Sequence, residues 1–336
     1  MKKVVTLGEV LLRLSPPGRN KIIGSSIFEV NVGGSEANVA VALSQFGIDT
    51  SLITKLPDNE LGDVAINKLR EFGVNTTYIV RGGDRIGIYF LENGYSFRPN
   101  KVLYDRKNSA MSKAKIKEFD LDQIFMDRDL LHVSGITLGI SEEGFQLGKA
   151  LIQAAAKRGL KVSFDFNYRS RLWSIDQARE KFEQVLKYVD IAFAGDFDFI
   201  NILGIEPDKS LENDILVYYE DLYSKVQKKY NFEWIVSSVR SVESASRNDY
   251  QGIIYNGKEF YYSNTYSIDI IDRVGTGDAL TAGFLYAYLS NKNNEYKVQF
   301  ATASSALKHT IPGDMLVATI EEIENLFMIG SFTIQR

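Results

Sequence analysis

The sequence predicts an α/β fold of three layers, in which helices cover both faces of a mostly parallel central sheet and a small β-sheet forms a lid. Short apolar runs alternate with helical patterns along most of the 336 residues, as parallel strands joined by helices do. Two segments, about 10–32 and 84–106, carry strand patterns without an intervening helix. We expect a single domain over residues 1–336, with these two segments as the lid.

The first part of the chain shows this alternation element by element. An apolar run at 4–7 predicts a buried parallel strand. Apolar residues at helical spacing predict a helix over 35–46. A strand at 51–56 and a helix at 61–72 follow, and Gly73 is a typical residue just beyond a helix end.

The same rhythm continues through the rest of the chain. Further strands are predicted at 130–134, 161–166, 191–194 and 234–237. Further helices are predicted at 142–157, 176–188, 211–230, 277–290, 295–308 and 319–327. Because ligands of such sheets bind beyond the carboxyl ends of the strands, we expect the functional residues there.

The two lid segments contain turn signals instead of helices. The first surrounds the turn "PPGRN", and the second alternates around "ENG", whose Asn-Gly pair favours a hairpin. Glycine pairs at 33–34 and 82–83 border the lid and are candidate hinges. A small hinged sheet would cover a ligand crevice. Its exposed strand edges also favour pairing of two lids in a homo-oligomer, a dimer or larger.

Composition and charge argue against several classes of partner and site. The net charge is −4 and no long basic cluster exists, so nucleic acid is not an expected partner. No apolar stretch of about 18 residues occurs, so no membrane span is expected. Glu9 and Arg13 interrupt the first apolar run, which we interpret as a strand of a cytoplasmic protein and not as a signal peptide. With no cysteine and only His132 and His309, disulfides and thiolate or histidine metal sites are not expected.

The stretch "DRVGTGDALTAGF" at 272–284 combines two glycines with an acidic helix start. Gly275 and Gly277 let the backbone turn and let a ligand approach closely. Backbone N–H groups at a helix start lack partners and attract anions such as phosphate. Asp278 would then lie beside a site for negative charge. The alternative is a plain turn followed by an aspartate that the helix dipole favours.

Four polar stretches fall at predicted strand ends or on the lid. They are "NVGGSEANVAVALSQFG" (31–47), "YDR" (104–106), "DFNYRSRLW" (165–173) and "DRVGTGDALTAG" (272–283). With them the chain resembles the ribokinase-like (PfkB) carbohydrate kinase family over about residues 3–327, and within it the 2-keto-3-deoxygluconate kinase branch. "GGSEANVA" is similar to the first signature of that family and "DRVGTGDALTAG" to the second, D-T-x-G-A-G-D.

The resemblance implies transfer of the γ-phosphoryl group of ATP, with Mg²⁺, to the terminal hydroxyl of 2-keto-3-deoxygluconate. It implies that Asp278 is the general base and that Gly275, Thr276 and Gly277 supply backbone N–H groups as an anion hole. Such a reaction needs a base, donors around the phosphoryl group and exclusion of water. The alternatives are a kinase for the galactonate epimer or for a neutral ketohexose such as fructose, and a sugar or nucleotide sensor without activity.

The resemblance also assigns residues to the sugar. Gly33, Gly34 and Asn38 would form the sugar-binding turn, since Asn38 offers both donors and an acceptor. The alternative for these three is an ordinary turn between a strand and a helix.

Four further residues match those that contact the keto-deoxy acid in this branch. They are Tyr89, Tyr104, Arg106 and Arg169, the two tyrosines coming from the lid. A guanidinium binds a carboxylate through two parallel hydrogen bonds, which suits both arginines to a sugar acid. The alternatives are a solvated lid charge for Arg106 and a structural salt bridge for Arg169.

ATP contacts are expected from two loops and the anion hole. Asn167 could face the phosphates or the sugar, and Ser237 and Arg240 could contact the phosphates, in addition to Gly275 and Gly277. An exposed structural arginine is the alternative for Arg240.

Two departures from the family pattern limit the assignment. Arg13 stands where many members carry an acidic residue that holds sugar hydroxyls, which argues against a ribose-type or ordinary fructose-type site. The N-x-x-E motif of the family appears as "GDFD", with Gly195 in place of Asn and Asp198 in place of Glu. The magnesium ligands therefore stay unassigned at this stage.

Overall fold

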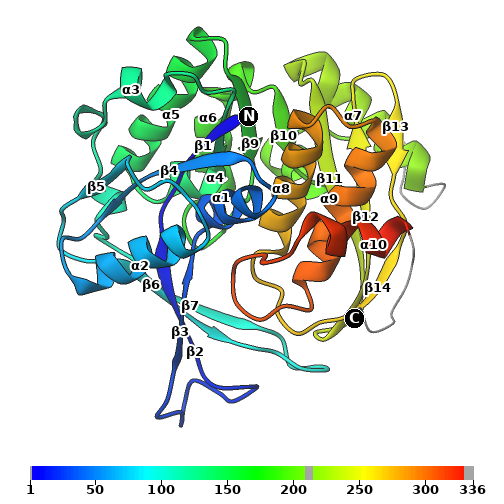
Figure 1. The fold of residues 1–336 in the computed structure, drawn as a ribbon. Coiled ribbons are helices and arrows are strands. Elements are labelled where there is room, and N and C mark those ends of the chain that lie inside the picture. The colour runs from blue at the N-terminus through cyan, green and yellow to red at the C-terminus, as the bar shows by residue number, and fades with distance from the viewer. Residues whose placement is uncertain (1, 209–214, 329–336) are drawn as a thin grey trace.

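A ten-stranded sheet forms the centre of the computed structural model, which describes residues 2–208 and 215–328 (Figure 1). Its strands lie in the order β13-β12-β11-β10-β9-β8-β1-β4-β5, and β14 also pairs with β12. The part from β11 to β5 is parallel, whereas β12 pairs antiparallel with β11, β13 and β14. The strands are β1 (Lys3–Leu7), β4 (Asp49–Leu56), β5 (Ile79–Arg81), β8 (Leu130–Ser134), β9 (Lys161–Asp165), β10 (Ile191–Phe193), β11 (Trp234–Ser244), β12 (Arg247–Tyr255), β13 (Phe260–Tyr262) and β14 (Tyr266–Asp269).

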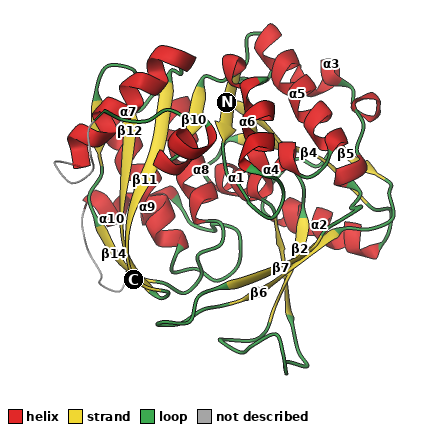
Figure 2. Cartoon of the chain, turned by 180° about the vertical axis from the view of Figure 1, so that it is seen from behind, coloured by secondary structure: helices red, strands yellow, loops and turns green. Residues whose placement is uncertain are grey.

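Helices cover both faces of this sheet, as Figure 2 shows. Successive strand side chains point to opposite faces, so that Val5 of β1 packs on the first face and Val4 on the second. The first face carries α3 (Leu121–Phe125), α4 (Gly135–Gly139), α5 (Glu142–Lys157), α6 (Ile175–Glu183) and α7 (Ile215–Tyr230). The second face carries α1 (Ser35–Gln45), α8 (Thr276–Leu289), α9 (Asn294–Lys308) and α10 (Ile320–Met328). The predicted three-layer fold is confirmed.

The remaining helical segments are shorter or lie beside the lid. The helix α2 (Glu60–Glu71) packs with α1 and the base of the lid strands. Single turns are found at η1 (Met111–Lys113), η2 (Ile116–Glu118), η3 (Leu186–Tyr188) and η4 (Asp198–Ile202). Within the described ranges, no helix combines the length and apolar character needed to cross a membrane.

A separate four-stranded sheet forms the predicted lid and projects from one end of the larger sheet (Figures 1 and 2). Its strands, in the order β3-β2-β6-β7, are β3 (Glu29–Gly33), β2 (Leu11–Ser15), β6 (Gly87–Glu92) and β7 (Lys101–Asp105). The register places Asn31, Arg13, Tyr89 and Tyr104 in one row across the four strands. Because directly paired residues share a face, these four side chains point to the same side of the lid.

The hairpin between β6 and β7 differs from the predicted Asn-Gly turn. The β6 strand ends at Glu92, and the chain turns further on, where Tyr95 and Arg98 pair as an isolated bridge. Gly94 packs so closely on the backbone of Arg98 that a side chain there would overlap it. The Asn-Gly pair therefore begins a longer loop and is not the turn itself.

Two predicted elements differ from the structure by more than two residues at one end. The strand predicted at 234–237 continues to Ser244, because its polar half pairs with β12 in a long, half-exposed hairpin that the sequence did not predict. The helix predicted at 176–188 ends at Glu183, before the separate turn η3. The helix predicted at 211–230 is seen from Ile215 onward, and its first four residues lie outside the described ranges.

Candidate active site

A cavity of about 620 Å³ lies between the inner face of the lid and the carboxyl ends of the parallel strands. Beside it the lid hairpin meets the β11–β12 hairpin, where Ala245 N donates to Ser96 O at 2.8 Å. Of the predicted site residues, those that line this cavity are Gly34, Asn38, Tyr89, Tyr104, Arg106, Asn167, Arg169, Arg240, Gly275, Thr276, Gly277 and Asp278.

A second cavity of about 250 Å³ adjoins the first. Asp165, Asn167, Arg169 and Gly277 line both cavities. Ser237 lines the smaller cavity, where its hydroxyl donates to the Ala194 carbonyl. The two cavities thus share part of their lining, including Gly277 in the first turn of α8.

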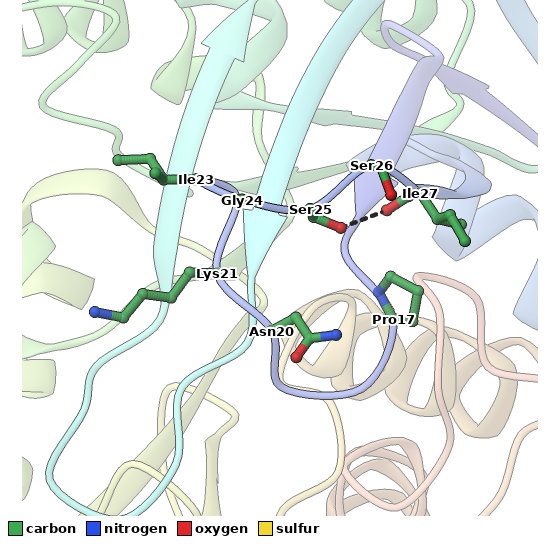
Figure 3. Close-up of a pocket in the computed structure, with 8 residues that line it drawn as sticks. All are labelled: Pro17, Asn20, Lys21, Ile23, Gly24, Ser25, Ser26 and Ile27. Atoms are coloured by element: carbon green, nitrogen blue, oxygen red, sulfur yellow. Dashed lines mark hydrogen bonds between the residues drawn. The ribbon is translucent and has the colours of Figure 1, made fainter.

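A third hollow lies in the lid loop between β2 and β3 (Figure 3). It shares no lining residue with the two cavities described above. It is lined by loop residues from Pro17 to Ile27, with the Ser25 hydroxyl donating to Ile27 O at 2.7 Å. Lys21 is the one titratable side chain that lines it. Because none of the predicted site residues reaches this hollow, we place the candidate active site in the two cavities under the lid.

Asp278 lies in the first turn of α8, where a carboxylate faces the helix N-terminus. It is only 8% exposed. The Ser35 hydroxyl donates to its Oδ1 at 2.7 Å, and Asn38 Nδ2 donates to its Oδ2 at 2.7 Å. Both donors come from the first turn of α1, so the two glycine-rich signatures meet at this carboxylate. Asn167 extends the chain of hydrogen bonds by donating from Nδ2 to Ser35 Oγ at 3.0 Å.

Burial raises the pKa of Asp278 from its ordinary 3.8 to about 6, although the hydrogen bonds from Asn38 and Ser35 favour the charged form. Loss of hydration also raises the pKa of Asp165, with repulsion from Asp278 and Asp198 adding to the effect. It raises the pKa of Asp198 to about 6. The charge of Arg169 lowers the pKa of all three carboxyls. The site therefore concentrates acidic groups that a cation would stabilise.

The predicted glycines have different roles in the structure. Gly275 adopts a left-handed conformation with φ 79°, and a side chain there would overlap the backbone oxygen of Asp314. A side chain at Gly33 would overlap the Asp314 carboxylate, which explains why Gly33 packs behind the cavity and does not line it. Gly277 has open space around its α-carbon. Close packing thus fixes one side of the α8 N-terminus and leaves the other side free for a ligand.

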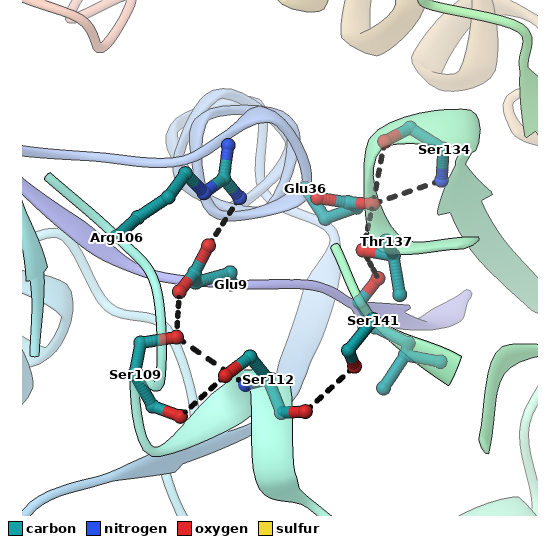
Figure 4. A network of polar contacts seen from close by, with 9 residues as sticks. Glu9, Glu36, Arg106, Ser109, Ser112, Ser134, Thr137 and Ser141 are labelled. Carbon is teal, nitrogen blue, oxygen red and sulfur yellow. Dashed lines mark hydrogen bonds and ion pairs between the residues drawn. The ribbon is translucent and has the colours of Figure 1, made fainter. Parts of the chain in front are cut away.

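Two buried glutamates, which the sequence analysis missed, also line the larger cavity (Figure 4). Glu9 accepts hydrogen bonds from Arg106 and from the Ser109 hydroxyl. Glu36 accepts from Ser134 N at 2.9 Å and from the hydroxyls of Ser134 and Thr137, each at 2.7 Å. Arg106 is therefore part of a buried ion pair, and the interpretation of a solvated lid charge is wrong.

Arginines without an acidic partner gather around the larger cavity. The residues described here provide no ion pair for four cavity-lining arginines, Arg169, Arg171, Arg240 and Arg273. Arg169 donates only to the neighbouring Tyr168 O, at 3.2 Å, so a structural salt bridge is not its role within the described ranges. Arg240 is exposed and stacks over Tyr250 at 5.2 Å. Uncompensated guanidinium groups of this kind match anionic ligands.

Comparison with known proteins identifies the family of this fold and site. The family model described as pfkB family carbohydrate kinase matches residues 1–319. A 2-dehydro-3-deoxygalactonokinase of Haloferax volcanii is 33% identical, with 99% of both chains covered. A 2-dehydro-3-deoxygluconokinase of Thermoproteus tenax is 28% identical, with 94% of this chain and 90% of the relative covered. A solved structure of 2-dehydro-3-deoxygluconokinase from Thermotoga maritima is 44% identical and superposes with a TM-score of 0.94, covering 97% of this chain and 99% of the other. The chain thus belongs to the pfkB family of carbohydrate kinases.

Proposed function

We propose that this kinase transfers the γ-phosphoryl group of ATP to the terminal hydroxyl of 2-keto-3-deoxygluconate, the same compound as 2-dehydro-3-deoxygluconate, and so forms the 6-phosphate. The observation that carries the proposal is the group of arginines that have no ion-pair partner among the described residues and line the cavity that also holds Asp278. A neutral sugar needs hydroxyl partners, whereas a sugar acid needs its carboxylate matched. The solved structure from Thermotoga maritima, which bears the gluconate name, supports the same substrate.

In this proposal Asp278 accepts the proton of the attacking hydroxyl. Ser35 and Asn38 hold the carboxylate by one hydrogen bond to each oxygen, which leaves its second lone pairs for the substrate. Gly275, Thr276 and Gly277 present backbone N–H groups to the charge that develops on the phosphoryl group. The lid covers the sugar acid and excludes water that would otherwise take the phosphoryl group.

The smaller cavity is the proposed place of the ATP phosphates, with Asn167 and Ser237 as contacts, and Arg240 would reach the phosphates from the larger cavity. Asp165 and Asp198 line it, and oxygen ligands of this kind suit Mg²⁺, which takes one or two carboxylates besides phosphate oxygens and water. When bound there, the ion would neutralise phosphate charge. Asp165 and Asp198 would hold it, since both carboxylates line this cavity, and a bound cation would favour their charged forms, which burial disfavours.

The galactonate epimer is the second candidate substrate, because the relative from Haloferax volcanii carries that name. ATP consumption with Mg²⁺ should be measured on 2-keto-3-deoxygluconate, its galactonate epimer, fructose, ribose and adenosine. Turnover confined to the two keto-deoxy acids supports the proposal, and the ratio of their rates decides between the epimers. Turnover on fructose or ribose alone contradicts the carboxylate site.

Arg169→Ala is expected to raise KM for the sugar acid by about ten- to a hundredfold, because a hydrogen-bonded charge contributes about 1.5–3 kcal/mol to binding. The value of kcat should change little, since the carboxylate is bound equally in the ground and transition states. Steady-state kinetics at saturating ATP give both constants. Arg70→Ala is the control, because Arg70 is an exposed arginine that lines neither cavity. An unchanged KM contradicts the carboxylate assignment, and a fall in kcat alone would place Arg169 at the phosphoryl group.

Turnover is expected to fall as the pH drops below about 6, because Asp278 can accept a proton only as a carboxylate. The pKa of Asp278 in the folded protein is raised to about 6. The ionised, active form is therefore lost when the pH falls below about 6, and not only when it falls below the ordinary 3.8. Ser35→Ala should shift this acid limb of the pH profile, the fall in activity at low pH, to higher pH by about one unit. The substitution removes a hydrogen bond that favours the charged carboxylate. The measurement is kcat/KM against pH. A limb that stays in place in Ser35→Ala contradicts its assignment to Asp278.

We also infer that two copies pair through their lids. Phe97 and Ile23 are 97% and 87% exposed, and Val30 and Leu103 add further apolar surface to the lid. Light scattering of the full chain tests this, and a monomer contradicts it.

A further inference from the structure

A buried cluster of charges joins the lid to the loop that carries the anion hole. Arg13, on lid strand β2, donates from Nη2 to Asp272 Oδ2 at 2.6 Å. Its Nη1 lies 3.1 Å from Asp314 Oδ2. Tyr89, paired in register with Arg13 on β6, donates its hydroxyl to Oδ1 of the same Asp314. Arg13, Asp272 and Asp314 are each 3% exposed, so a buried ion pair ties the lid to the loops that precede α8 and follow α9.

The two aspartates also contact the loop around Gly275. Asp272 accepts from Val274 N and from Gly313 N, each at 3.0 Å. The backbone oxygen of Asp314 lies against the α-carbon of Gly275, where a side chain would overlap it. Asp272 through its carboxylate and Asp314 through its backbone oxygen thus both contact the loop that carries the anion hole.

The cluster is balanced in charge by its own residues. Lys308 is fully buried, and its Nζ donates to Ile311 O at 2.8 Å. Burial lowers the pKa of Lys308 to about 8, against the opposing effect of Asp272 and Asp314. Arg13 and Lys308 therefore offset two carboxylates. Removing Arg13 would leave a buried carboxylate uncompensated, which forces a rearrangement around it.

The lid side of the cluster faces the sugar cavity. Tyr89 and Asp314 line that cavity, and the row of Arg13, Tyr89 and Tyr104 crosses the inner face of the lid. A ligand that contacts Tyr89 and Tyr104 would therefore touch the lid face from which Arg13 projects. Asp272 and Asp314 link Arg13 in turn to the loop around Gly275.

We propose that Arg13 is a positioning residue, which couples the closure of the lid on the sugar acid to the shape of the Gly275–Gly277 loop. Sugar-acid binding then strengthens ATP binding, and by thermodynamic linkage ATP strengthens binding of the acid by the same factor. This inference rests on the proposed function, because it needs a sugar acid under the lid. It gives Arg13 a role although its guanidinium points to the two aspartates and not to the substrate.

The test compares Arg13→Lys and Arg13→Met with the wild type. Calorimetry measures the Kd of a non-hydrolysable ATP analogue with Mg²⁺, in the absence and presence of saturating 2-keto-3-deoxygluconate. We expect the acid to tighten analogue binding by about tenfold in the wild type and by little in either variant. The Kd measured without the acid reports any effect of the substitution on the loop itself, so the coupling is taken as the ratio of the two Kd values within each variant. Arg85→Met is the matched control, because Arg85 is a lid arginine whose partner Asp105 also belongs to the lid.

The outcomes distinguish a coupling role of Arg13 from a purely structural one. If the acid tightens analogue binding in both Arg13 variants as much as in the wild type, even with a lower melting temperature, the ion pair is purely structural and the proposal is overturned. A wild type in which the acid does not tighten analogue binding also overturns it. If Arg13→Met does not fold, Arg13→Lys decides, because it keeps the buried positive charge but cannot reach both aspartates as a planar fork does. If the wild type phosphorylates another sugar of the panel, the proposed function fails, and the same measurement with that sugar still tests Arg13.

Discussion

Asp278→Asn is expected to lower kcat by about a thousandfold or more, within the range found for general bases, while the Kd of the sugar acid stays near that of the wild type. Asparagine has the shape of aspartate but cannot take up a proton from the hydroxyl. Its amide can still accept from Asn38 and donate to the Ser35 hydroxyl, so the hydrogen bonds around it survive in number. The loss should therefore appear in the chemical step and not in binding.

The melting temperature of Asp278→Asn supplies an independent control. Burial raises the pKa of Asp278, so its ionised form is less favourable in the folded than in the unfolded chain. This loss of folding free energy is absent at low pH, where the carboxyl is protonated, and reaches its full value above about pH 6. Above this pH the neutral variant should be more stable than the wild type, as expected where a site trades stability for activity. Turnover close to that of the wild type would remove Asp278 from the role of base.

The regular elements could be predicted because their signals are local. The helix over 142–157 and the strand over 130–134 have the predicted bounds, since apolar periodicity and a glycine at position 159 mark them within a few residues. Asp278 could be placed beside a glycine turn for the same reason, as Gly275 and Gly277 are its near neighbours in the chain.

The contacts that complete the site could not be predicted in this way. Arg13 and Asp272 are 259 residues apart in sequence, and Glu36 is bonded to Ser134 across 98 residues. No periodicity or motif within a single sequence specifies such pairs. The acidic interruption at Glu9 was visible in the first apolar strand, but its partner Arg106 lies on the lid. Polar residues that break an apolar run near a predicted crevice are the one signal that would have pointed to Glu9.

The long β11–β12 hairpin was missed for a related reason. Its outer half is polar and exposed, so residues after Val236 resemble a loop when read by hydrophobicity alone. Pairing with β12, and not burial, makes this segment a strand. The result matters for the site, because the hairpin carries Arg240 to the cavity and meets the lid at Ser96.

Gly275→Ala is expected to lower kcat by about a hundredfold or more and also to lower the melting temperature. At φ 79° an alanine costs about 1–2 kcal/mol in backbone strain. Its methyl group would also overlap the Asp314 backbone oxygen, which only a shift of the anion-hole loop can relieve. A displacement of about 1 Å at such a loop is enough for the expected loss of rate.

Gly277→Ala is the matched comparison, because its methyl group enters open space within helix α8. Alanine is the better helix former by about 1 kcal/mol, so the melting temperature should stay equal or rise. Its activity should nevertheless fall, since the methyl group occupies the space that the phosphates need in the proposed mechanism. Thermal melts and kcat for both variants separate the two effects. A Gly277→Ala variant with full activity would show that the phosphoryl group does not approach this residue, and would confine the anion hole to Gly275 and Thr276.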